Sequence, residues 1–334
     1  MVPFNPLLTW PWKILHWGFF RNHRKILVVD DTVAFTGGMN IGDQYASPKI
    51  GGNGYFRDTH VKVEGPAVAD LAKVFLGSLS ETGAKLPPNP EEEEEITPLT
   101  IRKQQQNAVV TSKHSHSDED NKGVFVQVLQ SNVPRNKLHI QKAIRLTLNN
   151  AMHHCYLTTP YFVPPQSLKR AMINAAKRGV DIRILTSGVS DVILVKLASQ
   201  HVYSLLLRNG VRIYELFGST LHAKTATIDG IYSSVGSFNL DTLSHYYNLE
   251  INLTILDHRM ASQLEDQFSR DIQYCTEVTL EDLEARSALR RFIHWAAYHI
   301  LRILSIKPLY NRVMFRNRNL PLSPTPSTEE VPKQ

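Results

Sequence analysis

The sequence predicts an α/β protein, and three observations lead to this prediction. Apolar runs of strand length alternate with amphipathic stretches of helical length along most of the 334 residues. A polar, acidic segment interrupts the alternation at residues 84–122. One sequence pattern occurs once before this segment and once after it. We therefore expect two folded parts, residues 1–83 and 123–285, joined by a disordered linker.

Composition limits the class of protein. Hydrophobic residues make up 42% of the chain and charged residues 20%, which allows a packed core and excludes a wholly disordered chain. The two cysteines, Cys155 and Cys275, are too few for a disulfide framework or a cysteine-based metal site. We expect them to be buried thiols in a reducing compartment.

The charge distribution indicates an anionic partner. The chain has a formal net charge of +6, yet residues 81–122 hold nine acidic and five basic residues. The rest of the chain therefore has a net charge of +10. A basic body of this kind is typical of proteins that bind nucleic acid or an acidic membrane surface.

The first twenty residues are apolar but predict neither a signal peptide nor a membrane span. Pro3, Pro6 and Pro11 interrupt the segment, which lacks a charged start and a small-residue cleavage site. No run of 18 apolar residues occurs anywhere in the sequence, so no ordinary transmembrane helix is expected. The tryptophans of this segment fit a membrane interface or a core position equally well.

The elements follow in order. In the first part, strands are expected at residues 25–29 and 60–63 and a helix at 67–79. In the second part, Pro160 ends a strand, Gly179 and Gly210 end two helices, and Asp229-Gly230 is a hairpin turn. These signals delimit strands at 124–129, 155–159, 181–186 and 211–216 and helices at 137–153, 165–178 and 192–208.

The last segment, residues 286–334, is basic and amphipathic. Residues 286–318 contain eight basic residues and no acidic residue, with aromatic and aliphatic residues between them. This pattern favours a helix at a membrane interface, and the alternative is a helix packed on the second folded part.

The repeated pattern is H-x-K-x4-D-x6-G-[GS]-x-N. The first copy supplies His23, Lys25, Asp30, Gly37, Gly38 and Asn40, and the second supplies His222, Lys224, Asp229, Gly236, Ser237 and Asn239. With ordinary residue frequencies, one chance copy in such a chain has a probability on the order of 10⁻⁵. Two copies at identical spacing therefore indicate a shared chemical role.

The spacing of the pattern indicates a site for a phosphodiester. A histidine and a lysine two residues apart on a strand project from the same face, so a base or nucleophile lies beside a fixed cation. The asparagine amide donates hydrogen bonds to an oxyanion. Two such sets suit a transition state with negative charge on phosphate oxygens. Neither a metal nor a cofactor is needed for this chemistry.

Four carboxylates receive different interpretations. Asp30 and Asp229 follow their histidines by an odd number of residues, and we interpret them, with the motif glycines and Ser237, as structural residues of turns and strand ends. Each histidine needs an acceptor for its second ring nitrogen. Asp58, and Glu250 in an apolar strand, are the candidates for this orienting role. The alternative for either is a surface salt bridge.

The double motif resembles that of the phospholipase D superfamily, and the surrounding sequence resembles its bacterial-type cardiolipin synthase branch. The resemblance rests on RNHRKILVVD, GGMNIGDQY and FRDTHVKVEGPAV, and then on TPYFVPPQSL, LHAKTATIDG, GSFNLD and NLEINL. It covers roughly residues 15–80 and 123–280. It implies two similar lobes, each a mixed β-sheet flanked by helices, with the active site between them.

The resemblance also implies a reaction. One histidine attacks phosphorus to give a phosphohistidine, the other protonates the leaving alcohol, and a second alcohol then displaces the enzyme. In cardiolipin synthases two phosphatidylglycerol molecules give cardiolipin and glycerol. By analogy His23 is the nucleophile and His222 the acid and base, which the sequence alone does not assign. The alternatives are another phospholipase D-type phosphodiesterase (a phospholipid hydrolase or a nuclease) and a non-catalytic membrane-binding fragment.

The expected partners are phosphatidylglycerol and a membrane surface. No nucleic acid is expected, because the basic and aromatic residues concentrate at 286–318 and do not form a stacking groove. The expected location is membrane-associated, at a mitochondrial or other organelle inner membrane. Members of the family carry a longer stretch before the first motif, so the first lobe is expected to be N-terminally truncated.

Overall fold

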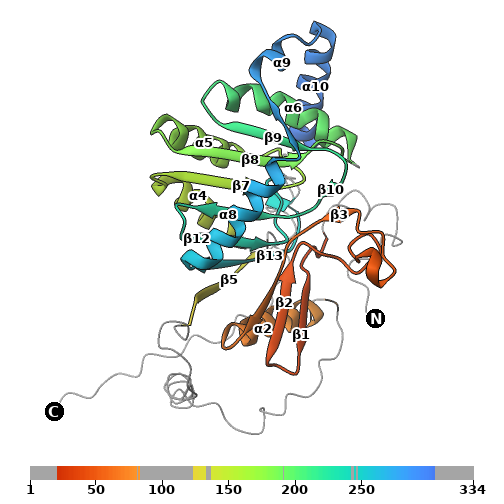
Figure 1. Cartoon of the computed structure of the whole chain (residues 1–334), viewed down its shortest axis with the longest axis vertical. Coiled ribbons are helices and arrows are strands. Elements are labelled where there is room, and N and C mark those ends of the chain that lie inside the picture. Colours follow the sequence, from red (N-terminus) through yellow and green to blue (C-terminus); the bar gives the residue numbers. More distant parts are fainter. Residues whose placement is uncertain are drawn as a thin grey trace, which may run out of the picture.

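The computed structural model describes residues 21–304 apart from residues 81, 83–122, 133–136, 191, 242–243 and 246. Its main feature is a mixed sheet of nine strands with helices on both faces (Figure 1). The strand order is β14-β9-β8-β7-β11-β12-β13-β5-β6. This architecture confirms the α/β class predicted from the sequence.

One part of this sheet is parallel. Strands β7 (His154–Thr158), β8 (Asp181–Ser187) and β9 (Arg212–Leu216) run parallel and are connected by α5 (Gln166–Lys177) and α6 (Ile193–Leu207). Parallel neighbours require crossovers of this kind. The antiparallel strands are β5 (Phe125–Asn132), β6 (Lys137–Leu138), β11 (Thr225–Ile228), β12 (Tyr232–Gly236), β13 (Glu250–Leu256) and β14 (Cys275–Val278).

Strand alternation divides the apolar residues between two layers. Ile182 and Ile184 of β8 pack in the main core with α4 (His139–Asn150), α5 and α6. Leu185 lies in the core on the other face, with Phe268 of α8 (His258–Ile272). Because successive side chains of a strand point to opposite faces, β8 contributes to both layers.

A smaller sheet carries the first motif. Strands β1 (Ile26–Val29), β2 (Val33–Gly37) and β4 (His60–Glu64) pair antiparallel in the order β1-β2-β4, and α2 (Ala67–Ser80) packs on them. Ala34, Val63 and Leu71 share a buried cluster with Ile251 and Leu253 of β13. The smaller sheet and α2 therefore pack their apolar side chains against β13 of the large sheet, whose other apolar residues form separate clusters.

Two further links join the first and second motif regions. Strand β3 (Phe56–Arg57) pairs parallel with β10 (Thr220–Leu221), and Asn22 forms an isolated parallel bridge with Leu249. A short 3₁₀ helix, η1 (Pro48–Ile50), lies in the loop before β3. These links position the residues just before each motif against the opposite half of the chain.

The expected elements match the observed bounds within one to three residues, but one other expectation is wrong. The helix expected at 137–153 spans His139–Asn150, because Lys137–Leu138 pairs with β5 and Ala151 leaves the helical conformation before β7. Both cysteines are free, yet only Cys155 is buried. Cys275 is partly exposed because it lies on β14, at the edge of the sheet.

The C-terminal part of the described chain consists of α9 (Leu280–Glu284) and α10 (Ala288–Leu304). A capping box between Thr279 and Asp282 begins α9. Helix α10 packs along α6 through Ala297, which lies in one buried cluster with Val195 and Ala198. Within the described residues, no helix is both long enough and apolar enough to cross a membrane.

Several expectations concern residues that the structure does not describe. The aromatic segment before residue 21, the linker at 84–122 and the tail after residue 304 lie outside the described residues.

Candidate active site

The two motif histidines lie just before strands rather than on them. The pattern predicted strand positions, yet His23–Lys25 precedes β1 and His222–Lys224 precedes β11. The reason is that their backbones bond the other half of the chain. The N–H of His23 donates to the carbonyl of Leu249 at 2.9 Å, and the N–H of His222 donates to the carbonyl of Arg57 at 2.8 Å.

Each histidine ring contacts the carboxylate that follows this backbone partner. Nδ1 of His23 lies 3.0 Å from Oε2 of Glu250, and Nδ1 of His222 lies 2.7 Å from Oδ2 of Asp58. Both distances fall within the range expected for an orienting hydrogen bond. With Nδ1 engaged, Nε2 of each ring remains for a reacting group. Burial lowers the pKa of His222 more than the bond to Asp58 raises it.

Glu250 is fully buried and still favours the ionised form. Burial alone raises the pKa of its carboxyl, but His23 and the hydroxyls of Ser237 and Ser244 together lower it below its usual value. Ser237 Oγ donates at 2.5 Å, Ser244 Oγ at 2.7 Å and Asn248 Nδ2 at 3.1 Å. A buried charge with this many donors is a firm hydrogen-bond acceptor for His23.

Close approach of the backbone explains two motif positions. A Cβ atom on Gly38 would lie 2.1 Å from Oδ1 of Asp58, so no side chain fits there. A Cβ atom on Gly236 would lie 2.2 Å from the carbonyl oxygen of Ile251. The second copy of the motif has Ser237 where the first has Gly38, and its hydroxyl bonds Glu250. The Gly-Gly pair of the first copy and the Gly-Ser pair of the second therefore pack closely against the segments that carry Asp58 and Glu250.

The motif lysines lie near the carboxylates of both halves. Burial lowers the pKa of Lys224 to about 7 and that of Lys25 to about 8, while Asp58 and Glu250 raise both values. Lys25 Nζ donates to the carbonyl of His23 at 2.7 Å, and Lys224 Nζ donates to that of His222. Because each lysine interacts with both carboxylates, the two motifs form one cluster.

The two motif asparagines differ in their surroundings. Asn40 is exposed, and its Nδ2 donates to the hydroxyl of Tyr45 at 2.9 Å. Asn239 is buried, and its Oδ1 has no hydrogen-bond partner among the described residues. The proposed contact of either amide with an oxyanion stays a prediction.

The motif aspartates lie at the far ends of the hairpins, away from the histidines. Asp30, Asp31 and Asp229 have left-handed φ angles of 50°, 53° and 53°, which aspartate tolerates in tight turns. Asp229 also accepts bonds from the backbone N–H groups of Met152, His153 and His154 at 2.8–3.0 Å. This geometry supports a structural interpretation of both motif aspartates.

Sequence reasoning missed several residues that contact the site. The hydroxyl of Tyr45 lies 3.3 Å from Nδ1 of His222, and its ring packs edge-on against the imidazole. Tyr45 follows Asn40 by five residues, and Ser244 follows Asn239 by five. The two residues differ, so a comparison of the copies marks the position but not its role. Burial raises the pKa of the nearby Asp241 to about 6.

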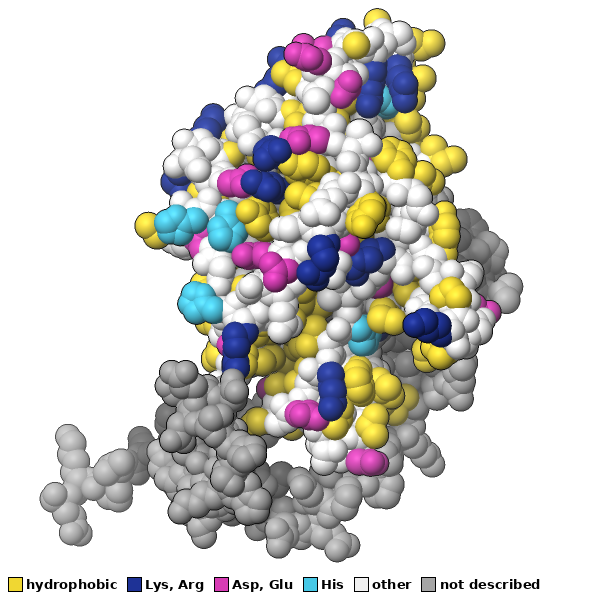
Figure 2. All heavy atoms as spheres, viewed as in Figure 1, with side chains coloured by type: hydrophobic (Ala, Val, Ile, Leu, Met, Phe, Trp, Pro, Cys, Tyr) yellow, Lys and Arg dark blue, Asp and Glu magenta, His cyan; other side chains and the backbone are white. Residues whose placement is uncertain are grey.

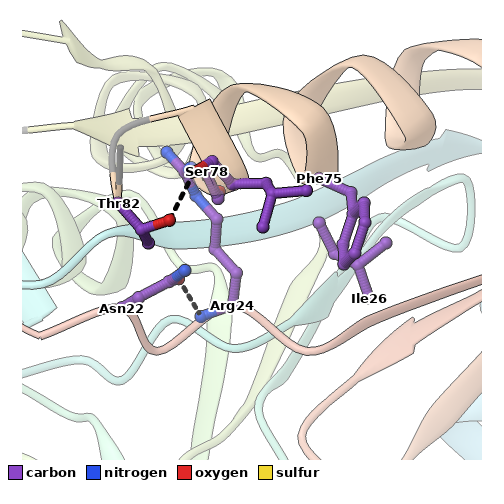
Figure 3. Close-up of a pocket in the computed structure, with 7 residues that line it drawn as sticks. Asn22, Arg24, Ile26, Phe75, Ser78 and Thr82 are labelled. Atoms are coloured by element: carbon purple, nitrogen blue, oxygen red, sulfur yellow. Dashed lines mark hydrogen bonds between the residues drawn. The ribbon is translucent and has the colours of Figure 1, made fainter. Parts of the chain in front are cut away.

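A cavity of about 190 Å³ lies near the first motif but contains none of its histidines (Figure 3). It is lined by Asn22, Arg24, Ile26, Phe75, Ser78, Leu79 and Thr82. Arg24 donates to Ser78 Oγ at 2.8 Å and to the carbonyl of Glu250 at 3.4 Å. Arg24 therefore ties the motif segment to α2 and β13, and we interpret this cavity as structural.

No group of three or more histidine, cysteine or acidic side chains within the described residues has the arrangement of a metal site.

Comparison with known proteins gives a consistent result. Residues 144–272 match the family model described as cardiolipin synthase, PLD-like domain. A cardiolipin synthase of Clostridium perfringens is 35% identical over 272 residues, which cover 81% of this chain and 54% of the relative. Cardiolipin synthase A of Proteus mirabilis is 32% identical over 286 residues, covering 85% of this chain and 54% of that protein. The chain thus spans about half the length of these curated relatives.

A solved structure has the same fold. Phosphatidylserine synthase of Haemophilus influenzae superposes with a TM-score of 0.60 at 16% identity, covering 87% of this chain and 71% of that chain. At this identity the likeness concerns the fold alone.

Proposed function

We propose that this chain, which belongs to the phospholipase D superfamily, is a phosphatidyltransferase of the cardiolipin synthase type. It would transfer a phosphatidyl group between two phosphatidylglycerol molecules and release glycerol. With lipids as donor and acceptor, the reaction takes place at a membrane surface, and an organelle inner membrane is part of this proposal.

One observation carries the proposal. The cations of both motifs interact with the orienting carboxylates of both halves, so two imidazoles and two ammonium groups belong to a single cluster. A phosphodiester anion needs this combination, because the lysines stabilise its oxygens while one ring attacks and the other handles the proton.

In the first half-reaction, Nε2 of one histidine attacks the phosphorus of the donor lipid. A P–N bond forms as the P–O bond to glycerol breaks, and the second histidine gives its proton to the departing oxygen. The carboxylate on Nδ1 stabilises the positive ring in each case.

In the second half-reaction, a headgroup hydroxyl of another phosphatidylglycerol enters. The second histidine removes its proton, the oxygen attacks phosphorus, and the P–N bond breaks to give cardiolipin. The same residue thus serves as acid and then as base.

The roles of the two histidines form part of the proposal. We assign the nucleophile to His23 by resemblance and the proton transfers to His222. Burial lowers the pKa of His222, so its ring gains a proton most readily once an anionic phosphate is bound beside it.

The test of the reaction is incubation of the purified full chain with vesicles that contain headgroup-labelled phosphatidylglycerol, followed by separation of lipids and released glycerol. Cardiolipin with an equal amount of free glycerol supports the transferase. Phosphatidic acid with glycerol instead identifies a hydrolase. If neither cardiolipin nor phosphatidic acid forms and no glycerol is released, an enzymatic role is contradicted. A chelator in a parallel reaction should leave the yield unchanged.

A second experiment tests the roles of the histidines. A phosphatidyl ester of nitrophenol has a leaving group that needs no proton. With this substrate His222→Ala should still release nitrophenol and accumulate the phosphohistidine, whereas His23→Ala should do neither. The reverse pattern would exchange the two roles.

A further inference from the structure

Helix α10 has two apolar faces. Its inner face includes Ala297, which is buried in one cluster with Val195 and Ala198 of α6. Its outer face carries large apolar side chains that are 42–70% exposed: Leu289, Phe292, Ile293, Trp295, Ile300 and Ile303. At 100° per residue these six side chains occupy an arc of about 160° whose centre lies roughly 120° from Ala297. Six exposed apolar side chains on one helix face indicate an interaction surface.

Basic residues flank this outer face. Arg291 and Arg302 are exposed and lie along one border of the outer face, next to Trp295, whereas the exposed Arg290 lies in the first turn on the inner side. The helix contains no acidic residue. Hydrophobic side chains follow the upper right edge of the molecule beside a group of basic ones (Figure 2). An apolar strip with a cationic border is typical of a helix that lies in a bilayer interface.

The end of α10 leads toward the active site. Arg208, at the end of α6, pairs with Glu284 just before α10, whereas Leu301 near the end of α10 packs against the same cluster as Leu194 at the start of α6. The two helices are therefore antiparallel. The exposed side chains of Val189 and Ile193, in and after the β8–α6 loop, thus lie at the same end as Ile300 and Ile303.

The same apolar edge continues to the mouth of the active site. Gly188, beside Val189, packs against the exposed ring of Phe217, and Thr220 bonds the carbonyl of Tyr55. Tyr55 precedes Phe56, whose ring contacts the His222 imidazole. The loop between β2 and β3, which includes Tyr55, also exposes Ile41 and Ile50. The loop, the start of α6 and α10 all lie along the right-hand side of Figure 1.

We infer that the outer face of α10, the start of α6 at Ile193 and the loop bearing Ile50 form one surface that docks on an anionic phospholipid bilayer. The inference rests on the proposed function. A phospholipid keeps its acyl chains in the bilayer while its phosphate reacts, so the mouth of the site must meet the membrane. The loop that brings Tyr45 to His222 exposes Ile41 and Ile50, and the exposed apolar face of α10 has a basic border.

A second copy of the chain fits this surface less well. A two-fold dimer pairs a patch with itself, which would bring the arginines of α10 against those of its partner. The helix has no acidic residue to offset this repulsion. Anionic headgroups supply the missing counter-charge.

The test compares the full chain with two double variants. Phe292→Ser/Ile303→Ser alters α10, and Ile50→Ser/Ile193→Ser alters the loop before β3 and the start of α6. Met152→Ser is the matched control, because Met152 is equally exposed but lies before β7, at the opposite end of the parallel strands. Flotation with vesicles of phosphatidylglycerol and phosphatidylcholine measures binding. Each double variant should bind at least about tenfold more weakly than the parent, and Met152→Ser should bind like the parent.

A soluble substrate separates docking from catalysis. On dihexanoyl phosphatidylglycerol dispersed as monomers, all variants should turn over like the parent, whereas on vesicles the double variants should be slower. Unchanged vesicle binding by both double variants overturns the inference, as does a parent dimer that dissociates on Phe292→Ser/Ile303→Ser substitution. Vesicle binding through this face without any cardiolipin formation would overturn the proposed function alone.

Discussion

His23 and Glu250 lie 227 positions apart in the chain, yet Nδ1 of one is 3.0 Å from Oε2 of the other. The relationship is reciprocal, because Asp58 of the first half contacts His222 of the second at 2.7 Å. Each backbone also bonds the residue before the carboxylate, Leu249 or Arg57. Neither half of the chain therefore contains an oriented histidine of its own, and correct pairing of the two halves is a condition for activity.

Substitution of Asp58 tests this orientation directly. In Asp58→Asn, Oδ1 can still accept the N–H of Thr59, but an amide N–H replaces the oxygen that faces Nδ1 of His222. The ring is then held in the opposite tautomer. We expect kcat to fall by about 10²- to 10⁴-fold with little change in thermal stability. The matched control is Asp70→Asn, an exposed aspartate of α2 that should leave kcat unchanged. Near-normal turnover of Asp58→Asn would contradict the orienting role.

Glu250→Gln should have a different effect, because this carboxylate is also a structural acceptor. Ser237, Ser244 and Asn248 all donate to it in a fully buried position. We expect a loss of activity together with a decrease of about 2 kcal/mol or more in the free energy of unfolding. Denaturant titration checks this value. Because the folded-state pKa of Glu250 is lowered, its contribution is present at neutral pH and is lost as pH falls below about 4. A Glu250→Gln chain as stable as its parent would contradict this interpretation.

The sequence predicted which residues come together at the candidate site better than which carboxylate contacts which histidine. Two copies of one pattern identified both histidines and both lysines, and Gly179 and Gly210 marked where α5 and α6 end. Strands β3 and β10 have two residues each, which is too short for any periodicity. Their pairing is a long-range contact, and it determines which carboxylate meets which histidine. Tyr45 was missed because its role depends on the fold of the loop that brings it to His222.

Asp229 tests whether the motif aspartate is structural. Asp229→Ala removes an acceptor of three backbone N–H groups and places alanine at a φ of 53°. We expect the free energy of unfolding to fall by about 2 kcal/mol, with kcat of the folded protein within about threefold of the parent. Asp229→Asn, which tolerates the same backbone conformation and keeps one acceptor, should lose less. A large loss of kcat in stable Asp229→Asn protein would assign the aspartate to the chemistry.

Asp241 should destabilise the fold at neutral pH. Burial raises the pKa of its carboxyl to about 6, and the neighbouring charge of Glu250 also raises it. The folded state therefore holds a proton that the unfolded state releases near pH 4. The stability that this proton contributes is present below about pH 4 and is lost as pH rises through about 6. Asp241→Asn, whose Oδ1 can still accept the N–H of Ser244, should be more stable than the parent at pH 7.5 but not at pH 4. Thermal melts across this range measure the difference, and parallel curves would contradict the buried-acid interpretation.

The lysines predict how oxyanion binding depends on pH. Burial lowers the pKa of Lys224 to about 7 and that of Lys25 to about 8, so both ammonium groups lose their charge in the free protein as pH rises from 6 to 9. An anion at the site favours the charged lysines and must therefore take up protons when it binds above these values. Tungstate keeps a constant charge over this range and serves as the probe. The Kd of tungstate should rise by about tenfold per pH unit for each proton taken up, and this rise should become steeper above pH 8. Calorimetry in two buffers of different ionisation enthalpy counts the protons directly.

In Lys224→Met the affinity for tungstate should be lower at pH 6, and its decline with pH should begin only near 8, because Lys25 alone then titrates. A Kd that stays constant from pH 6 to 9 would show that neither ammonium group contacts the anion.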